Sequence, residues 1–241
     1  MRGILLVARR DFLAYINSWW GWAILAMALL INGLLFNFRA MGTSPRYSAE
    51  VLSDFFQNTG GIALFASAVI TMRLFAEERQ TGTMVLLESS PLSELQVVLG
   101  KYLSGIGVLA MYLVLSMYMP AMIFVNGKVS YAEIAVGYLG VLTMGSAAIA
   151  IGTWASSVSR NQIIAVVITA VVPTNFVACW MLSRVLDPPF KAIFAYLAFF
   201  DKHMQAFQEG RINTESLVYF GSVTFAFLLL STRALVARRW E

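Results

Sequence analysis

The sequence predicts an all-α integral membrane protein with six transmembrane helices. Its composition is 59% hydrophobic and only 12% charged, whereas soluble domains carry about 25% charged residues. The charges are clustered, and they leave six long uncharged stretches, which are residues 12–38, 55–72, 102–127, 134–159, 161–183 and 216–232. Each stretch has about the length, roughly 17 to 25 residues, that a bilayer core requires. A soluble helical bundle would need polar faces at helical spacing, which these stretches lack.

Residues 1–18 predict an amphipathic helix that lies on the inner membrane surface ahead of the first span. Its apolar residues fall on one face at three- and four-residue steps, and these are Leu5, Ala8, Phe12, Tyr15 and Ile16. The other faces carry the charged residues Arg2, Arg10 and Asp11. Trp19, Trp20 and Trp22 then follow, where indole rings mark a membrane interface.

We expect spans near residues 19–38, 55–72, 104–125, 134–156, 161–183 and 217–235, with residues 39–54 as a short outer loop. Pro120 should kink the third span or lie close to its outer end. Pro173 falls near the middle of the fifth span, where it either bends the helix along a pathway or is accommodated by neighbouring helices. Cys179, the only cysteine, fits a small buried hydrophobe. His203, the only histidine, lies in a polar segment that predicts a solvated or interfacial side chain.

Small residues recur along the fourth predicted span. Ala148, Gly152 and Ser156 follow one another at four-residue steps, beside Gly145 and Ser146. Such a stripe lets another helix approach closely. We expect the stripe to pack within one chain, and a seam between two copies is the alternative.

The longest predicted loop, residues 184–215, is not uniformly polar. Its apolar part, residues 192–200, is far too short to cross a bilayer. It therefore predicts an outer re-entrant or interfacial hairpin after the Asp187-Pro188-Pro189 turn. Because no repeat or second domain is evident, we interpret residues 1–241 as a single transmembrane domain.

The distribution of basic residues predicts that both termini lie in the cytoplasm. In that orientation ten of the 17 Lys and Arg residues lie on the inner side with six acidic residues, and the other seven lie outside with seven acidic residues. An excess of positive charge inside is typical of multi-pass proteins of the inner (plasma) membrane. The net charge of +4 therefore does not require a nucleic-acid partner.

No catalytic motif is present in the sequence. It contains no G-x-S-x-G, H-E-x-x-H or C-x-x-C, and no G-x-x-x-x-G-K-[ST] that would hold ATP phosphates. The predicted spans carry no charged residue or histidine in their apolar cores. This disfavours coupling to a proton gradient but leaves open sodium sites made of carbonyl and hydroxyl oxygens. We therefore expect neither catalysis nor a metal or cofactor site in this chain.

The segment between the second and third predicted spans, residues 73–101, has the features of a docking site for a soluble partner. Gly82 can end the helix that carries residues 77–79 by adopting a left-handed conformation. Residues 83–88 then form a further short helical turn, which Ser90 and Pro91 break.

Ser93 and Gln96 match a capping box, which starts the helix that continues through Lys101 into the third span. A rigid helix–turn–helix at this position would carry force from a soluble partner into two spans at once. The alternative is a solvated connector without such a role.

This segment resembles a known family. The run F-A-E-E-R-Q-T-G-T-M-V-L-L-E-S-S-P-L-S at residues 75–93, followed by V-L-G-K-Y at residues 98–102, resembles the E-E-[RK]-x-x-G-T-x-x-x-L-x-x-x-P-[LVI]-S…G-K signature of ABC-2 type transporter permeases. Glu88 departs from the signature, since an apolar or hydroxyl residue is more usual there. The layout of six spans, surface helix and outer hairpin is also similar to type V ABC exporters. The length and the motif are similar to gliding-motility-associated, copper-processing and multidrug-type members.

The resemblance implies the transmembrane permease subunit of an ATP-driven exporter. Its expected partners are a separate ABC ATP-binding subunit, which holds the ATP and Mg²⁺, and a second permease subunit that is identical or similar. The implied ATPase-coupling residues are Glu77, Glu78, Arg79, Gly82, Thr83, Pro91, Ser156 and Arg160. The residues implied to position the surface helix are Arg2, Arg9 and Arg10.

Two other functions remain open on the sequence. The first is a membrane scaffold or force transmitter, for example in gliding motility, in which the same ATPase acts on a periplasmic or envelope partner through residues 187–215. The second is an ion-coupled carrier. The cargo is not identified, because apolar walls are compatible with lipids, drugs, glycans or peptides.

Overall fold

The computed structural model describes residues 2–40, 47–84, 89, 91–127, 129–187 and 190–238. Helices make up almost all of this part of the chain, and no strand occurs in it. The helices are α1 (Arg2–Ile16), α2 (Trp19–Ala40), α3 (Ser48–Thr71), α4 (Ala76–Gln80), α6 (Glu94–Ser116), α7 (Tyr118–Asn126), α8 (Tyr131–Val158), α9 (Gln162–Val185), α10 (Phe190–Leu197), the π-helix η1 (Phe199–Met204), α11 (Gln205–Gln208) and α12 (Thr214–Arg238).

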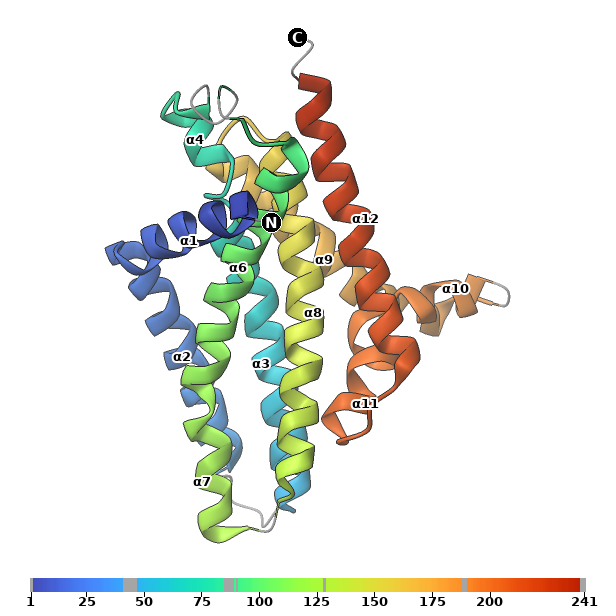
Figure 1. Cartoon of the computed structure of the whole chain (residues 1–241). Helices are drawn as coiled ribbons and strands as arrows, with labels where there is room; N and C mark the ends of the chain where they lie inside the picture. The colour runs from blue at the N-terminus through green and yellow to red at the C-terminus, as the bar shows by residue number, and fades with distance from the viewer. Residues whose placement is uncertain are drawn as a thin grey trace.

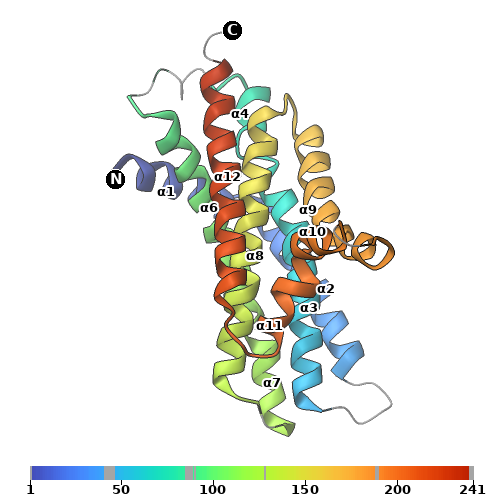
Figure 2. The same ribbon diagram turned by 90° about the vertical axis from the view of Figure 1, so that its right-hand side faces the viewer.

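Six helical segments within the described residues are long and apolar enough to cross a bilayer, which confirms the predicted fold class. They are Trp19–Phe38, Ser48–Gln80, Glu94–Ile123, Tyr131–Val158, Gln162–Val185 and Thr214–Ala237. The long helices form an elongated bundle, and α1 lies across one end of it (Figure 1). The same end, called here the α1 end, also carries α4 and the C-terminal end of α12 (Figures 1 and 2).

Helix α8 forms the centre of the bundle and packs against α3, α6, α9 and α12. Its small residues make these contacts close: a side chain at Gly145 would meet Leu109 of α6, and one at Gly152 would meet Thr71 of α3 and Thr169 of α9. Ala148 and Ser156 of the same stripe are fully buried. The stripe therefore packs within one chain, as predicted.

The third span is broken as its proline predicts. Helix α6 ends at Ser116 and α7 begins at Tyr118, with Met117 between them. Pro120 lacks the backbone N–H that would donate to the carbonyl of Ser116 in a continuous helix, so the break lies one turn before the proline.

The second span begins earlier than the sequence predicted. Helix α3 starts at Ser48 rather than near residue 55, so the predicted outer loop of residues 39–54 is wrong in its second half. Glu50 lies in the first turn of α3, where a carboxylate is stabilised by the helix dipole. A charged residue therefore marked the start of a helix and not a loop.

The segment predicted to form an outer hairpin contains α10, η1 and α11. Helix α10 projects sideways from the bundle, and α11 lies nearer the end away from α1 (Figure 1). Pro188 and Pro189 of the predicted turn lie outside the described residues. The prediction of a solvated or interfacial His203 is wrong, because its side chain is fully buried between η1, α10 and α12.

Helix α2 is joined to the bundle by a buried polar cluster. Asn32 is fully buried, although Leu30 and Leu34 beside it are 58% and 63% exposed. Its Nδ2 donates to Thr59 Oγ1 of α3 and lies 3.0 Å from the Tyr112 hydroxyl of α6. The cluster thus joins three spans in a region where an unpaired amide would be costly.

Replacing Asn32 with Ala should lower the unfolding free energy by about 1–3 kcal/mol, because Thr59 and Tyr112 lose their buried partner. Thermal unfolding in one detergent measures this. Asn37→Ala, at an exposed position of the same helix, is the matched control and should change the melting temperature little. Equal melting temperatures for the two variants would show that the cluster does not hold α2.

Candidate functional site

The candidate site lies at the α1 end, where the chain between α3 and α6 folds back on the bundle. Helix α4 is a single short turn that ends at Gln80, and Thr81 and then Gly82, with φ of +71°, follow it. This left-handed conformation favours glycine. A Cβ atom at Gly82 would have open space around it, so the backbone angle alone requires glycine there. The predicted helical turn at residues 83–88 lies largely outside the described residues.

The start of α6 confirms the predicted capping box. The Ser93 side chain accepts from the Gln96 backbone N–H, and the Gln96 side chain accepts from the Ser93 N–H. The helix then runs from Glu94 past Lys101 into the third span. The box therefore fixes where the segment that carries α4 rejoins the bundle.

Helices α4 and α8 cap each other. Ser156, fully buried near the end of α8, accepts from the backbone N–H groups of Phe75 (3.0 Å) and Ala76 (3.1 Å) at the start of α4. In return Arg79 of α4 donates to the carbonyl oxygens of Ser157 and Ser159 at the end of α8. Helix ends leave these backbone groups without partners of their own. Each helix therefore supplies the side chain that the other needs.

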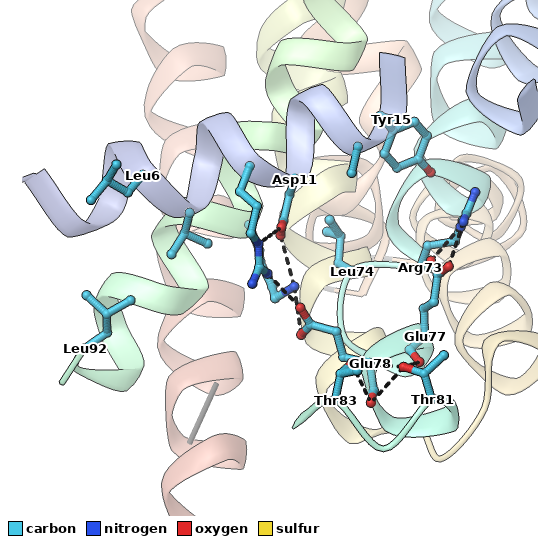
Figure 3. A pocket seen from close by; sticks show the side chains of 14 residues that line it. Leu6, Asp11, Tyr15, Arg73, Leu74, Glu77, Glu78, Thr81, Thr83 and Leu92 are labelled. Atoms are coloured by element: carbon cyan, nitrogen blue, oxygen red, sulfur yellow. Dashed lines mark hydrogen bonds and ion pairs between the residues drawn. The ribbon is translucent and has the colours of Figure 1, made fainter. Parts of the chain in front are cut away.

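A buried cation joins three elements at this end. Lys101 of α6 is 2% exposed, and its ammonium lies 3.0 Å from Asp11 Oδ2 of α1 and 3.0 Å from Glu78 Oε2 of α4. Its hydrogen bond goes to Asp11, whereas Glu78 Oε2 is an ion-pair partner without a hydrogen bond. Arg10 completes the network by pairing with both Asp11 (2.8 Å) and Glu78 (2.7 Å). We call these four residues the α1–α4–α6 network (Figure 3).

The geometry corrects the predicted orientation of α1. Asp11 was placed away from the packed face, but it points toward α6, and Val7 and Tyr15 of the same face are buried. Gly100 of α6 permits the contact, since a Cβ there would lie 2.6 Å from Val7 Cβ. Pairing with a buried lysine overrode the simple apolar pattern.

The C-terminal end of α1 is fixed to α3. The Tyr15 hydroxyl donates to the Ile70 carbonyl (2.7 Å), and burial raises the pKa of this phenol, which keeps it protonated as a donor. Arg73 forms two hydrogen bonds with Glu77, at 2.6 and 2.7 Å, and reaches Ser18 beyond α1. Burial lowers the pKa of Arg10, but Asp11 and Glu78 outweigh it and leave that pKa raised.

An open groove of about 700 Å³ lies between α1 and α4. Its charged wall is the α1–α4–α6 network with Arg73 and Glu77, and its apolar wall includes Leu6, Leu74 and Leu92 (Figure 3). Leu6 is 66% exposed at its edge. The groove thus combines charged and apolar surface within one concave face.

The structure brings the predicted coupling residues to one end of the molecule but divides them by burial. Gln80 to Thr83, Pro91 and Arg160 are exposed, as are Arg2 and Arg9 on α1. Ser156 is fully buried, and Glu77, Glu78 and Arg79 bond within the chain. The first group offers surface to a partner, and the second holds that surface on the bundle.

Sequence reasoning missed Lys101, Asp11, Ser157 and Ser159 as parts of the site. A signal existed for Lys101, because a lysine at the border of an apolar span, inside the helix that forms that span, needs a partner. No signal identified Ser157 and Ser159, since they contribute only backbone carbonyl oxygens.

Replacing Lys101 with Met should leave the carboxylates of Asp11 and Glu78 without their buried cation, so that only Arg10, whose side chain is 54% exposed, still pairs with them. Loss of one partner of a buried ion pair costs about 3–5 kcal/mol, so thermal unfolding should occur at lower temperature and trypsin should cleave faster at Arg9 and Arg10. Adding Asp11→Asn to Lys101→Met should recover part of the loss. Exposed Lys191→Met is the control, and an unchanged Lys101→Met protein would refute the role of the network.

Comparison with known proteins places this geometry in a family. The sequence matches the family described as "ABC-2 family transporter protein" over residues 18–186, which is more than half of the chain. The matched region runs from the start of the first span to the end of the fifth and includes α4 and the capping box. No curated protein matches the sequence significantly. With six helices able to span a bilayer, the chain belongs to the ABC-2 transporter family and is a multi-pass membrane permease component of an ABC transporter.

Proposed function

We propose that this permease component couples ATP hydrolysis on a separate ABC ATP-binding subunit to the export of a substrate. The α1 end then faces the cytoplasm, and the exposed surface around Gln80–Thr83, Pro91 and Arg160 is the docking surface for the ATPase. ATP and Mg²⁺ reside on that partner. Both termini then lie in the cytoplasm, in agreement with the excess of basic residues at this end.

The observation that carries the proposal is the reciprocal capping of α4 and α8. A push on the surface around Gly82 reaches α8 through Ser156 and Arg79, and it reaches α6 and α1 through Glu78 and Lys101. Because these contacts are buried or partly buried hydrogen bonds and ion pairs, they resist sliding. The docking surface is therefore connected to the central span and to the third span together.

A second permease subunit is the expected partner within the membrane. Only 17% of the most apolar stretch of α9 is buried within the chain, so most of this helix faces outward. Its outward surface is not purely apolar, because Thr174 and Asn175 are exposed near its middle. Helix α3, which packs against α9, leaves Gln57 exposed and has open space at Gly61. Polar side chains on a span face a partner or a water-filled path more readily than lipid. These positions are candidates for the wall of the transport path.

Affinity purification of the tagged chain from its native membrane should recover a stoichiometric ATP-binding subunit. Thr83→Trp should reduce that recovery at least tenfold, because a bulky ring on the docking surface prevents close contact. Thr214→Trp, exposed at the opposite end of the bundle, is the matched control and should leave recovery unchanged. Reproducible absence of any ATP-binding protein with the intact wild-type chain would refute the proposal.

Gly82→Val should separate assembly from coupling. A branched side chain at positive φ costs about 1–2 kcal/mol. The backbone should relax from this conformation and change the shape of the docking surface. Because the side chain meets no clash, insertion and folding should persist. The chain should then stimulate the ATPase of its partner several-fold less than the wild-type chain does. Gly221→Val is the control, since a Cβ there also has open space and its backbone is not left-handed. Equal stimulation by the two variants would contradict a coupling role for Gly82.

A further inference from the structure

The π-helix η1 holds the only histidine of the chain in a closed aromatic site. His203 is fully buried, and its ring stacks on Tyr219 of α12 with centroids 4.0 Å apart and planes within 9°. Tyr196 of α10 and Phe220 of α12 meet the same ring edge-on, at 5.3 and 5.9 Å. One side chain of η1 therefore contacts both α10 and α12.

The hydrogen bonds of His203 place a hydrogen on Nε2 and set Nδ1 beside a serine hydroxyl. Nε2 lies 2.9 Å from the carbonyl oxygen of Tyr196, and because a carbonyl only accepts, Nε2 carries the hydrogen. Nδ1 lies 3.3 Å from Oγ of Ser216, which is itself fully buried. The neutral ring donates to α10 and accepts from α12, so both of its nitrogens have partners.

Helix α10 is attached differently from η1 and α11. Phe199, Met204 and Phe207 of those two elements are fully buried in the core and hold them in place. Helix α10 has no buried residue, and it is held mainly by the Tyr219 hydroxyl, which donates to Leu197 (2.8 Å), and by its contact with α9. The Lys202–Glu215 pair is 42% and 44% exposed, so solvent screens it and it adds little. Apart from its packing on α9, the docking of α10 on η1 and α12 therefore depends on the Tyr219 hydroxyl and on the His203 ring.

Protonation of His203 would place a charge among aromatic rings away from water. Burial lowers the pKa of the imidazole, and the neighbouring ammonium of Lys202 acts in the same direction. The hydrogen bond to Tyr196 and the carboxylate of Glu215 oppose this shift without cancelling it. The phenols of Tyr196 and Tyr219 are the other titratable groups on the ring, and Cys179 of α9 lies near Tyr219. From α8 and α9, no further charged group within the described residues acts on His203.

We propose that α10 (Phe190–Leu197) is a pH-responsive latch, docked on η1 and α12 while His203 is neutral and released from them when His203 is protonated. A histidine with a lowered pKa in the docked state contributes its full stabilisation above its ordinary pKa of about 6.5. That contribution is lost as the pH falls below this value. The latch thus responds to acidification of the compartment that it faces, and it does not depend on ATPase coupling.

The first experiment titrates His203 directly in the intact chain. Because there is one histidine, protein with ¹³C-labelled histidine, purified through a tag without histidine and placed in lipid nanodiscs, gives a single ring signal. Its midpoint should lie below the ordinary value of about 6.5, because the docked state favours the neutral ring. A midpoint at or above about 6.5 would overturn the proposal without any variant.

The second experiment follows release through the only cysteine, Cys179, which is partly buried. Maleimide labelling of the wild type is compared with that of His203→Gln at each pH, so that the pH dependence of the thiol cancels in the ratio. Gln keeps a polar side chain that does not titrate. The ratio of wild-type to variant labelling should rise several-fold between pH 7.5 and pH 5, because only the wild type gains a charge at position 203. A ratio that stays constant would refute release, and if the variant does not fold, the histidine titration decides alone.

Discussion

The exchange of caps between α4 and α8 is the constraint on which the α1 end depends. A five-residue helix such as α4 is too short to be stable by itself. It exists because Ser156 satisfies its first N–H groups, and α8 ends as it does because Arg79 satisfies its last carbonyl oxygens. The exposed Gly82 turn therefore has a defined position only while α8 is in place.

The α1–α4–α6 network extends this constraint to the surface helix. Lys101 is almost completely buried and is shared between carboxylates from two other elements. Such a cation contributes little net stability compared with an apolar core, but it strongly disfavours any arrangement that leaves it unpaired. It consequently selects one relative position of α1, α4 and α6 among several that apolar packing alone would permit.

The features that could be predicted from the sequence follow from local rules. Six spans follow from length and apolar composition, the start of α6 from the Ser93–Gln96 box, and the end of α4 from Gly82. Each depends on residues that lie close together in the chain. The burial of His203 could not be predicted, since its partners Ser216 and Tyr219 lie more than three helical turns away along the chain. The same holds for Asp11, whose partner Lys101 is 90 residues distant. The early start of α3 was missed because its charged first turn resembles a loop.

Inside the bilayer, each polar group of this bundle requires a particular hydrogen-bond partner within the protein. Water is absent there, so each buried hydroxyl or amide needs a partner from the protein. Many Ser and Thr hydroxyls donate to a carbonyl one turn earlier in their own helix, as Thr153 and Thr169 do. Asn32 cannot satisfy its amide in that way alone and bonds to two other spans.

This bonding of Asn32 has a consequence for biogenesis. The chain is made from its N-terminus, so α2 enters the membrane before Thr59 and Tyr112 have been synthesised. Until α3 and α6 arrive, the amide of Asn32 has neither of its final partners, and this side chain opposes the movement of α2 out of the wetter surroundings of the insertion machinery. Helix α6 is the last of the three to be made, and it supplies the last partner of Asn32. Helix α2 is therefore fully bound to the bundle only after α6 is present, and the order of assembly differs from the order of synthesis.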